Sequence, residues 1–207
     1  MKQLNEITEA IRHDMTTRTQ ARDTALATSR SLISACARSI RAAHREEFDT
    51  ARTLLAEAGQ LAADLHAATN DKPDLYYAGY TQDGLKEYVE ANLVLAMITN
   101  QPLPTPAALN VIGATWLSGL AEAASEMRRR ILDIIRHEGQ LDEAERLLDV
   151  MDAVYTQLLT FDFPDNVTYG LRRTTDALRG VLERTRGDLT MSLRQQQLQS
   201  AIERRLP

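Results

Sequence analysis

The sequence has little of what forces a chain to turn or to cross-link. Its 207 residues include 9 glycines, 6 prolines and 1 cysteine, and aromatic residues make up only 5%. The single cysteine, Cys36, excludes an internal disulfide framework and a zinc site of several thiolates. Its alanine neighbours in a helical pattern predict a small buried side chain. With so few aromatic residues the core depends on aliphatic side chains, which favours helices over strands.

Long apolar runs are also missing. No stretch approaches the roughly 18 apolar residues that cross a bilayer. The first six residues lack the apolar centre of a signal peptide, so we expect a cytoplasmic protein. The net charge of −5 does not by itself favour nucleic acid as a partner. Binding of phosphates therefore depends on a local basic surface.

What is present is helical periodicity. Apolar residues recur at spacings of three and four, and hydrophobic residues amount to 43% of the chain, enough for one core. We predict a single domain over residues 1–207, all-α, built as an antiparallel stack of about six to seven helices with short connections. The expected helices are 4–44, 46–69, 81–100, 106–137, 141–159 and 166–205. Thr81 and Thr105 are the expected N-caps of the third and fourth helices, and Gly139 is expected to close the fourth.

Two of these helices carry glutamate pairs at the border of the apolar face. On a helical wheel, Glu87 and Glu90 lie one turn apart in the third helix, and Glu122 and Glu126 lie together in the fourth. Antiparallel packing of the two helices would bring four carboxylates together, which requires a cation or protons to offset their repulsion. Oxygen ligands alone select Mg²⁺ or Mn²⁺, and such an ion supports phosphodiester hydrolysis. The competing interpretation is a solvated helix face, the usual place for such pairs.

Basic and aromatic residues suggest where nucleic acid would bind. Four arginines fall within about a quarter of the first helix's circumference, and a fifth in the fourth helix is expected to assist them. These arginines are Arg30, Arg38, Arg41, Arg45 and Arg129. They either follow a phosphate backbone or pair with acidic neighbours. Tyr76, Tyr77 and Tyr80 near the third helix either stack on bases or cover an edge of the core.

At the glutamates the sequence resembles the translin/TRAX family. Residues 84–91, Gly-Leu-Lys-Glu-Tyr-Val-Glu-Ala, look like the TRAX segment that carries its first two catalytic acids. Residues 116–127 are similar to the segment that carries the second acidic pair, with Glu122 standing where TRAX has an aspartate. Residues 44–48 and 171–189 also resemble family segments, so the resemblance spreads over most of the chain.

The resemblance implies more than the composition does. Translin and TRAX are seven-helix proteins that assemble into closed hexameric or octameric shells and bind single-stranded nucleic acid inside. A chain with acids at all four TRAX positions and without long eukaryotic insertions looks like a compact prokaryotic, archaeal-type homologue that assembles with itself. We predict a Mg²⁺-dependent (or Mn²⁺-dependent) endoribonuclease that cleaves single-stranded RNA and, as a second substrate, single-stranded DNA. One or two ions would be held by Glu87, Glu90, Glu122 and Glu126.

Three other functions stay open at this point. The first is a non-catalytic nucleic-acid-binding shell like translin, whose binding survives loss of the glutamates. The second is an all-α nucleoside triphosphate pyrophosphohydrolase, which also places paired carboxylates on neighbouring helices but usually in a denser Glu-Glu-x-x-Glu cluster. The third is a structural helical oligomer that binds no metal.

Overall fold

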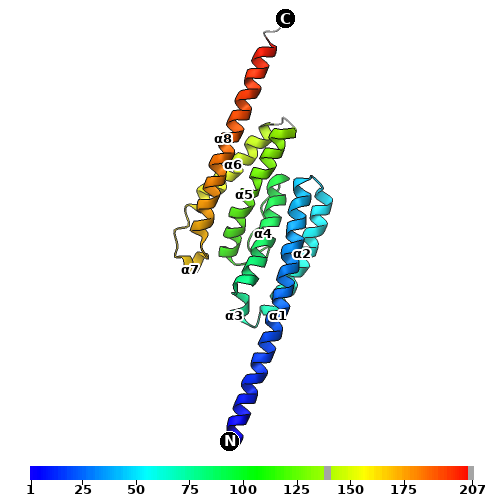
Figure 1. Ribbon diagram of the computed structural model, residues 1–207, viewed down its shortest axis with the longest axis vertical. Coiled ribbons are helices and arrows are strands. Elements are labelled where there is room, and N and C mark those ends of the chain that lie inside the picture. The colour runs from blue at the N-terminus through cyan, green and yellow to red at the C-terminus, as the bar shows by residue number, and fades with distance from the viewer. Residues whose placement is uncertain (138–140, 205–207) are drawn as a thin grey trace.

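The computed structural model describes residues 1–137 and 141–204 (Figure 1). These residues form eight α-helices and no strand, which confirms the all-α class. The helices are α1 (Lys2–His44), α2 (Phe48–Thr69), α3 (Pro73–Tyr76), α4 (Gly79–Ile98), α5 (Gly113–His137), α6 (Leu141–Leu158), α7 (Asp165–Thr168) and α8 (Leu171–Glu203). Six of them are long, and α3 and α7 have four residues each.

The long helices pack side by side in an elongated stack. α2 packs on α1, α1 on α4, α4 on α5, and α5 on both α6 and α8. The beginning of α1 and the end of α8 extend beyond the stack at opposite ends (Figure 1). α4 is therefore central, and from Val89 to Ile98 every residue except Asn92 is buried. Within the described ranges, no helix is both long and apolar enough to cross a membrane.

The core consists of aliphatic side chains, as the composition predicts. The buried side chains of α1 and α2 are mostly small, and Cys36 is fully buried as expected. Small side chains let helix axes approach closely. The largest fully buried side chains of α5, α6 and α8 are Met127, Ile131, Ile134, Leu147, Met151, Leu171, Leu178 and Leu189. Burying each of these contributes about 1.5–3 kcal/mol relative to leaving it exposed.

The direction of the central helices differs from the predicted antiparallel arrangement. α1 and α2 are antiparallel. Between α4 and α5, by contrast, residues further along α4 contact residues further along α5. Thr115 donates to the side chain of Gln82 at 2.6 Å, and Lys86 donates to Glu122 at 2.8 Å. α4 and α5 are therefore parallel, and residues 99–112 carry the chain back along the stack (Figure 1).

The helix boundaries correct both predicted N-caps and divide one predicted helix. α5 begins at Gly113 and not after Thr105, because residues 105–110 form turns in which Thr105 Oγ1 accepts from the backbone N–H of Ala108. Thr81 lies inside α4, where its hydroxyl donates to the backbone oxygen of Leu75. The last predicted helix divides into α7 and α8. Gly139, which was predicted to end the fourth helix, lies outside the described residues.

Candidate functional site

The glutamates of α4 and α5 face each other because these helices approach closely. At Gly119 of α5, an added Cβ atom would lie 2.7 Å from Cγ1 of Val89 and 3.0 Å from the backbone oxygen of Lys86. Packed side chains do not tolerate such distances, so this crossing needs glycine. Glu87 and Glu90 follow these two α4 residues and are thus held within reach of the glutamates on α5.

We expect Gly119→Ala to force α4 and α5 apart. Overpacking of this kind destabilises by about 1–3 kcal/mol, although alanine is the better helix former. Guanidinium denaturation measures the change in stability, and calorimetric titration with Mg²⁺ measures the accompanying loss of cation affinity. The control is Gly180→Ala on α8, where the nearest atom, Nη1 of Arg184, is 3.5 Å from the new Cβ. Equal stability and Mg²⁺ affinity for both variants would contradict the argument.

Three of the four predicted ligands come together. Glu87, Glu90 and Glu122 each offer a carboxylate oxygen, and these oxygens all lie within 4.8 Å of one another. Oxygens around one Mg²⁺ at about 2.0–2.1 Å stand roughly 3.0 to 4.2 Å apart in octahedral geometry. The three residues therefore fit a hard divalent cation after small side-chain movements, and the donor set contains only oxygen.

Glu90 is the most perturbed acid of this cluster. Its side chain is buried, with 8% exposed, and has no ion-pair partner among the described residues. Burial, followed by the charges of Glu87, Glu122 and Glu126, raises its pKa to about 8. A cation at this place would remove both the repulsion and the need for a proton. Behind the cluster, burial and the charges of Glu87 and Glu90 raise the pKa of Cys36 to about 12, so Cys36 remains a neutral thiol.

Lys86 is the cation that the structure itself places beside the acids. Its Nζ atom lies 2.8 Å from the carboxylate of Glu122 and 3.6 Å from Oε1 of Glu87. Burial by itself lowers the pKa of Lys86, but the hydrogen bond and charge of Glu122, with the charge of Glu87, outweigh it and raise the pKa. Burial raises the pKa of Glu87, which Lys86 only partly offsets. The lysine therefore neutralises part of the cluster, but its charge is the smallest influence on Glu90, and the pKa of Glu90 stays raised.

Glu126, the fourth predicted ligand, stands next to this cluster and is held by a histidine. Its Oε2 lies 2.8 Å from Nε2 of His44, whose side chain is 1% exposed. The hydrogen bond from His44, more than its charge or that of Arg129, lowers the pKa of Glu126 despite burial. An ionised carboxylate only accepts, so Nε2 of His44 carries the proton and donates. Glu126 is thus an oriented carboxylate beside a crowded set of acids.

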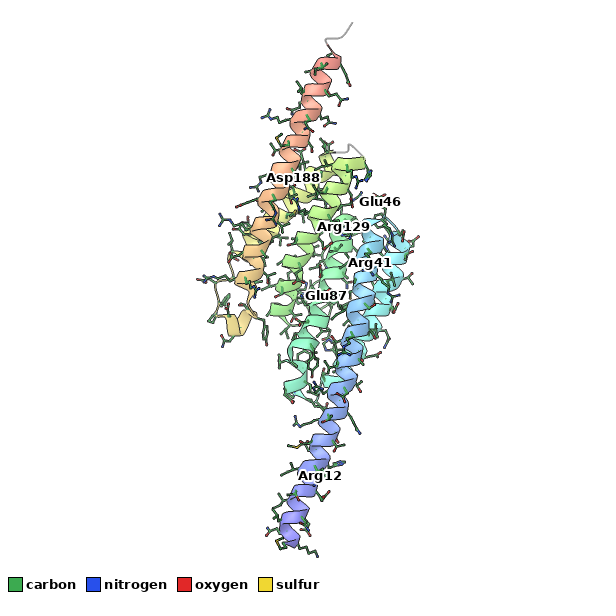
Figure 2. The ribbon with its side chains drawn as sticks, viewed as in Figure 1. Arg12, Arg41, Glu46, Glu87, Arg129 and Asp188 are labelled. Atoms are coloured by element: carbon green, nitrogen blue, oxygen red, sulfur yellow. The ribbon has the colours of Figure 1, made fainter. Side chains whose placement is uncertain are left out.

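The predicted phosphate-binding arginines are all exposed, but they differ in their partners. Arg38 pairs with Glu57 at 2.7 Å, and Arg45 pairs with Glu47 at 2.8 Å. Such surface pairs contribute about 0–1 kcal/mol and are easily exchanged for a phosphate. Across residues 1–137 and 141–204, no ion pair is formed by the other three arginines, Arg30, Arg41 and Arg129. Figure 2 shows Glu87 midway along the stack, with Arg41 and Arg129 nearer the end at which α1 stops.

Sequence reasoning missed the roles of Lys86 and His44. A signal for His44 existed, because it continues the apolar stripe of Ile33, Ala37 and Ile40 at helical spacing. A histidine on a buried stripe needs a polar partner, and Glu126 is that partner. For Lys86, the signal was its position directly before Glu87, because a lysine next to a pair of acids is placed to neutralise part of their charge.

Similar proteins come from sequence and from structure comparison. An uncharacterised protein of Methanocaldococcus jannaschii is 29% identical over 185 residues, which cover 88% of this chain and 81% of the relative. The solved complex of AfC3PO with duplex RNA has a TM-score of 0.83 and 31% identity, over 89% of this chain and 95% of that one. Apo-NeC3PO has a TM-score of 0.81 at 19% identity, over 89% and 96% of the two chains, and shows the fold alone. No family model matches the sequence.

Proposed function

Because this chain belongs to the translin/TRAX family, we propose that it binds RNA and cleaves it as a metal-dependent endoribonuclease. The main support is the cluster of Glu87, Glu90 and Glu122, whose oxygens lie within 4.8 Å of one another with Glu90 buried among them. Clustered carboxylates without sulfur or nitrogen donors suit Mg²⁺ or Mn²⁺, and phosphodiester hydrolysis is chemistry that such an ion serves.

Each residue of the site has a defined task in this proposal. Glu87, Glu90 and Glu122 would hold the ion, which polarises the phosphate and lowers the pKa of water. His44 keeps Glu126 ionised and oriented, so Glu126 can hold the attacking water and accept its proton. The ammonium of Lys86, 2.8 Å from Glu122, is placed to offset negative charge on the phosphate.

RNA as the substrate rests on two observations. AfC3PO has been solved with duplex RNA, and this chain carries exposed arginines that have no ion-pair partner among the described residues. We propose single-stranded RNA as the cleaved form and single-stranded DNA as a second ligand, since a flexible strand can bend its phosphate into a site that lies between two helices. The arginines Arg30, Arg38, Arg41, Arg45 and Arg129 would hold the backbone.

Self-association is part of the proposal. The beginning of α1 extends beyond the stack (Figure 1) and exposes apolar side chains at helical spacing. These side chains are Leu4, Ile7, Ile11 and Met15, each at least half exposed. A soluble helix with one exposed apolar face normally buries it against a partner. We propose that copies of this chain cover it in a homo-oligomeric shell of six or eight subunits.

A cleavage assay tests the enzymatic proposal. We expect purified protein to cut a labelled single-stranded RNA in Mg²⁺, and both EDTA and Glu126→Gln to reduce the rate by about 10³-fold, since the lost transition-state stabilisation is several kcal/mol. The matched control is Glu183→Gln, which removes an exposed carboxylate that pairs with Arg179 on α8. Duplex RNA and a nucleoside triphosphate are assayed beside the single strand.

Each outcome decides between functions. Cleavage that needs both Mg²⁺ and Glu126 supports the nuclease. RNA binding without cleavage, unchanged in Glu126→Gln, makes the chain a binding shell like translin and removes the catalytic assignment. Hydrolysis of the nucleoside triphosphate without cleavage of RNA makes it a pyrophosphohydrolase. Cleavage by Glu126→Gln at the wild-type rate places the activity elsewhere or in a contaminant.

A further inference from the structure

A small polar groove adjoins the carboxylate cluster on the side of α8. Its volume is about 180 Å³, and it lies between α4, α5 and the segment that leads into α8. Glu122 belongs to both the groove and the cluster, and Lys86, which also lines the groove, lies 2.8 Å from its carboxylate. The groove and the cluster are therefore adjacent. The groove is small and open to solvent on one side, so a single sugar or base can enter it from a strand that passes over the site.

The other lining side chains are those that recognise a nucleotide. Hydroxyl groups come from Ser118 of α5 and Thr174 of α8, and Thr115 of α5 donates its own hydroxyl to the side chain of Gln82, which also lines the groove. An aromatic ring comes from Tyr169. Lys86 supplies a positive charge, and Asp83 adds a carboxylate acceptor. Hydroxyls and a carboxylate suit a sugar, a tyrosine ring suits the face of a base, and an ammonium suits a phosphate.

Tyr169 is held in a backbone conformation that its side chain does not favour. Its φ and ψ angles are 51° and 41°, in the left-handed region, where glycine and asparagine are the usual residues. Burial does not account for a tyrosine here, because 51% of the residue is exposed. A bulky residue kept in a strained position at the edge of a site indicates a functional use of its side chain.

We propose that this groove binds one unpaired nucleotide of a single-stranded nucleic acid, with its base against Tyr169 and its phosphate near Lys86. The inference rests on the proposed function, because the adjacency of the groove and the cluster would place the bound nucleotide next to the phosphate presented to the carboxylates. The bound base must be unpaired, since a paired base is already stacked on its neighbours and does not offer a free face to the tyrosine.

Binding of a short RNA tests this inference without relying on cleavage. The probe is a single-stranded RNA with one fluorescent adenine analogue, whose emission falls when the base stacks, measured in Ca²⁺ and in EDTA. We expect Tyr169→Phe to bind like the wild type, because the ring face remains. We expect Tyr169→Asn to bind about 5- to 150-fold more weakly and to lose the fall in emission. Its melting temperature should stay equal or rise, because asparagine tolerates this backbone.

The control and the outcomes separate this inference from the nuclease. Phe163→Asn removes a similarly exposed aromatic ring, 58% against 51%, that does not line the groove, and should bind like the wild type. If RNA binding depends on Tyr169 but the protein does not cleave RNA, the proposed nucleotide-binding groove is supported and the proposed nuclease activity is contradicted. If Tyr169→Asn binds and cleaves RNA like the wild type, the proposed nucleotide-binding groove is contradicted and the proposed nuclease activity is supported. Failure of the wild type to bind the probe also overturns the groove.

Discussion

Glu90→Gln is expected to stabilise the cation-free protein at neutral and alkaline pH while abolishing its response to Mg²⁺. The carboxylate of Glu90 is buried beside three other glutamates, and its pKa is raised to about 8. Glutamine keeps the shape and removes the charge. The same change deletes a proposed cation ligand, so Mg²⁺-dependent cleavage should fall by about 10³-fold or more.

The raised pKa of Glu90 fixes the direction of the pH dependence. Between the ordinary value of 4.5 and about 8, the folded protein binds more protons at Glu90 than the unfolded chain does. The free energy of unfolding therefore falls as pH rises through this window and levels off above it. This contribution of Glu90 is on the order of a few kcal/mol in the absence of a cation. The variant should lose this slope, and Mg²⁺ should remove it from the wild type.

Thermal denaturation in EDTA and in Mg²⁺, from pH 5 to pH 9, measures both effects. The control is Glu57→Gln, an exposed glutamate whose side chain is 50% accessible and whose loss should leave the pH profile unchanged. A Glu90→Gln protein that melts lower than the wild type at pH 8 in EDTA would show that Glu90 is compensated by a contact other than a cation. That result would remove the physical basis for a metal at this place.

Much of the fold could be predicted because helical periodicity and proline positions are local signals. The helix predicted over 46–69 is α2, Phe48–Thr69, and the one predicted over 141–159 is α6, Leu141–Leu158. The start of α5 could not be placed in the same way. Residues 99–112 are fixed by tertiary contacts: Nε1 of Trp116 donates to the backbone oxygen of Pro104, and Leu109 is buried.

The arrangement of the site was only partly contained in the sequence. The border position of the glutamates on two apolar faces predicted which acids could meet. Hydrophobic periodicity is the same whichever way a helix runs, so it could not show that α4 and α5 are parallel. Nor could it pair His44 with Glu126, 82 residues away, or place Tyr169 beside Lys86. Such contacts follow from the order in which the helices stack.

The pairing of His44 with Glu126 yields the second large expected effect. His44→Ala removes the donor that orients and ionises Glu126, and should lower Mg²⁺ affinity and cleavage by about 10- to 100-fold. It also leaves a cavity where a buried ring stood, so some stability is lost as well. His44→Gln places an amide N–H near the position of Nε2 and should recover most of the Mg²⁺ affinity.

Rescue by glutamine separates orientation from packing. If His44 acted only as a filler of the core, a leucine would restore function as well as glutamine, because both side chains occupy the space. We therefore compare His44→Leu with His44→Gln by Mg²⁺ titration, with His13→Ala on the exposed part of α1 as the control. Recovery by leucine would contradict the positioning role. Recovery by glutamine alone means that Glu126 needs a hydrogen-bond donor at position 44, which orients its carboxylate toward the cation and the water.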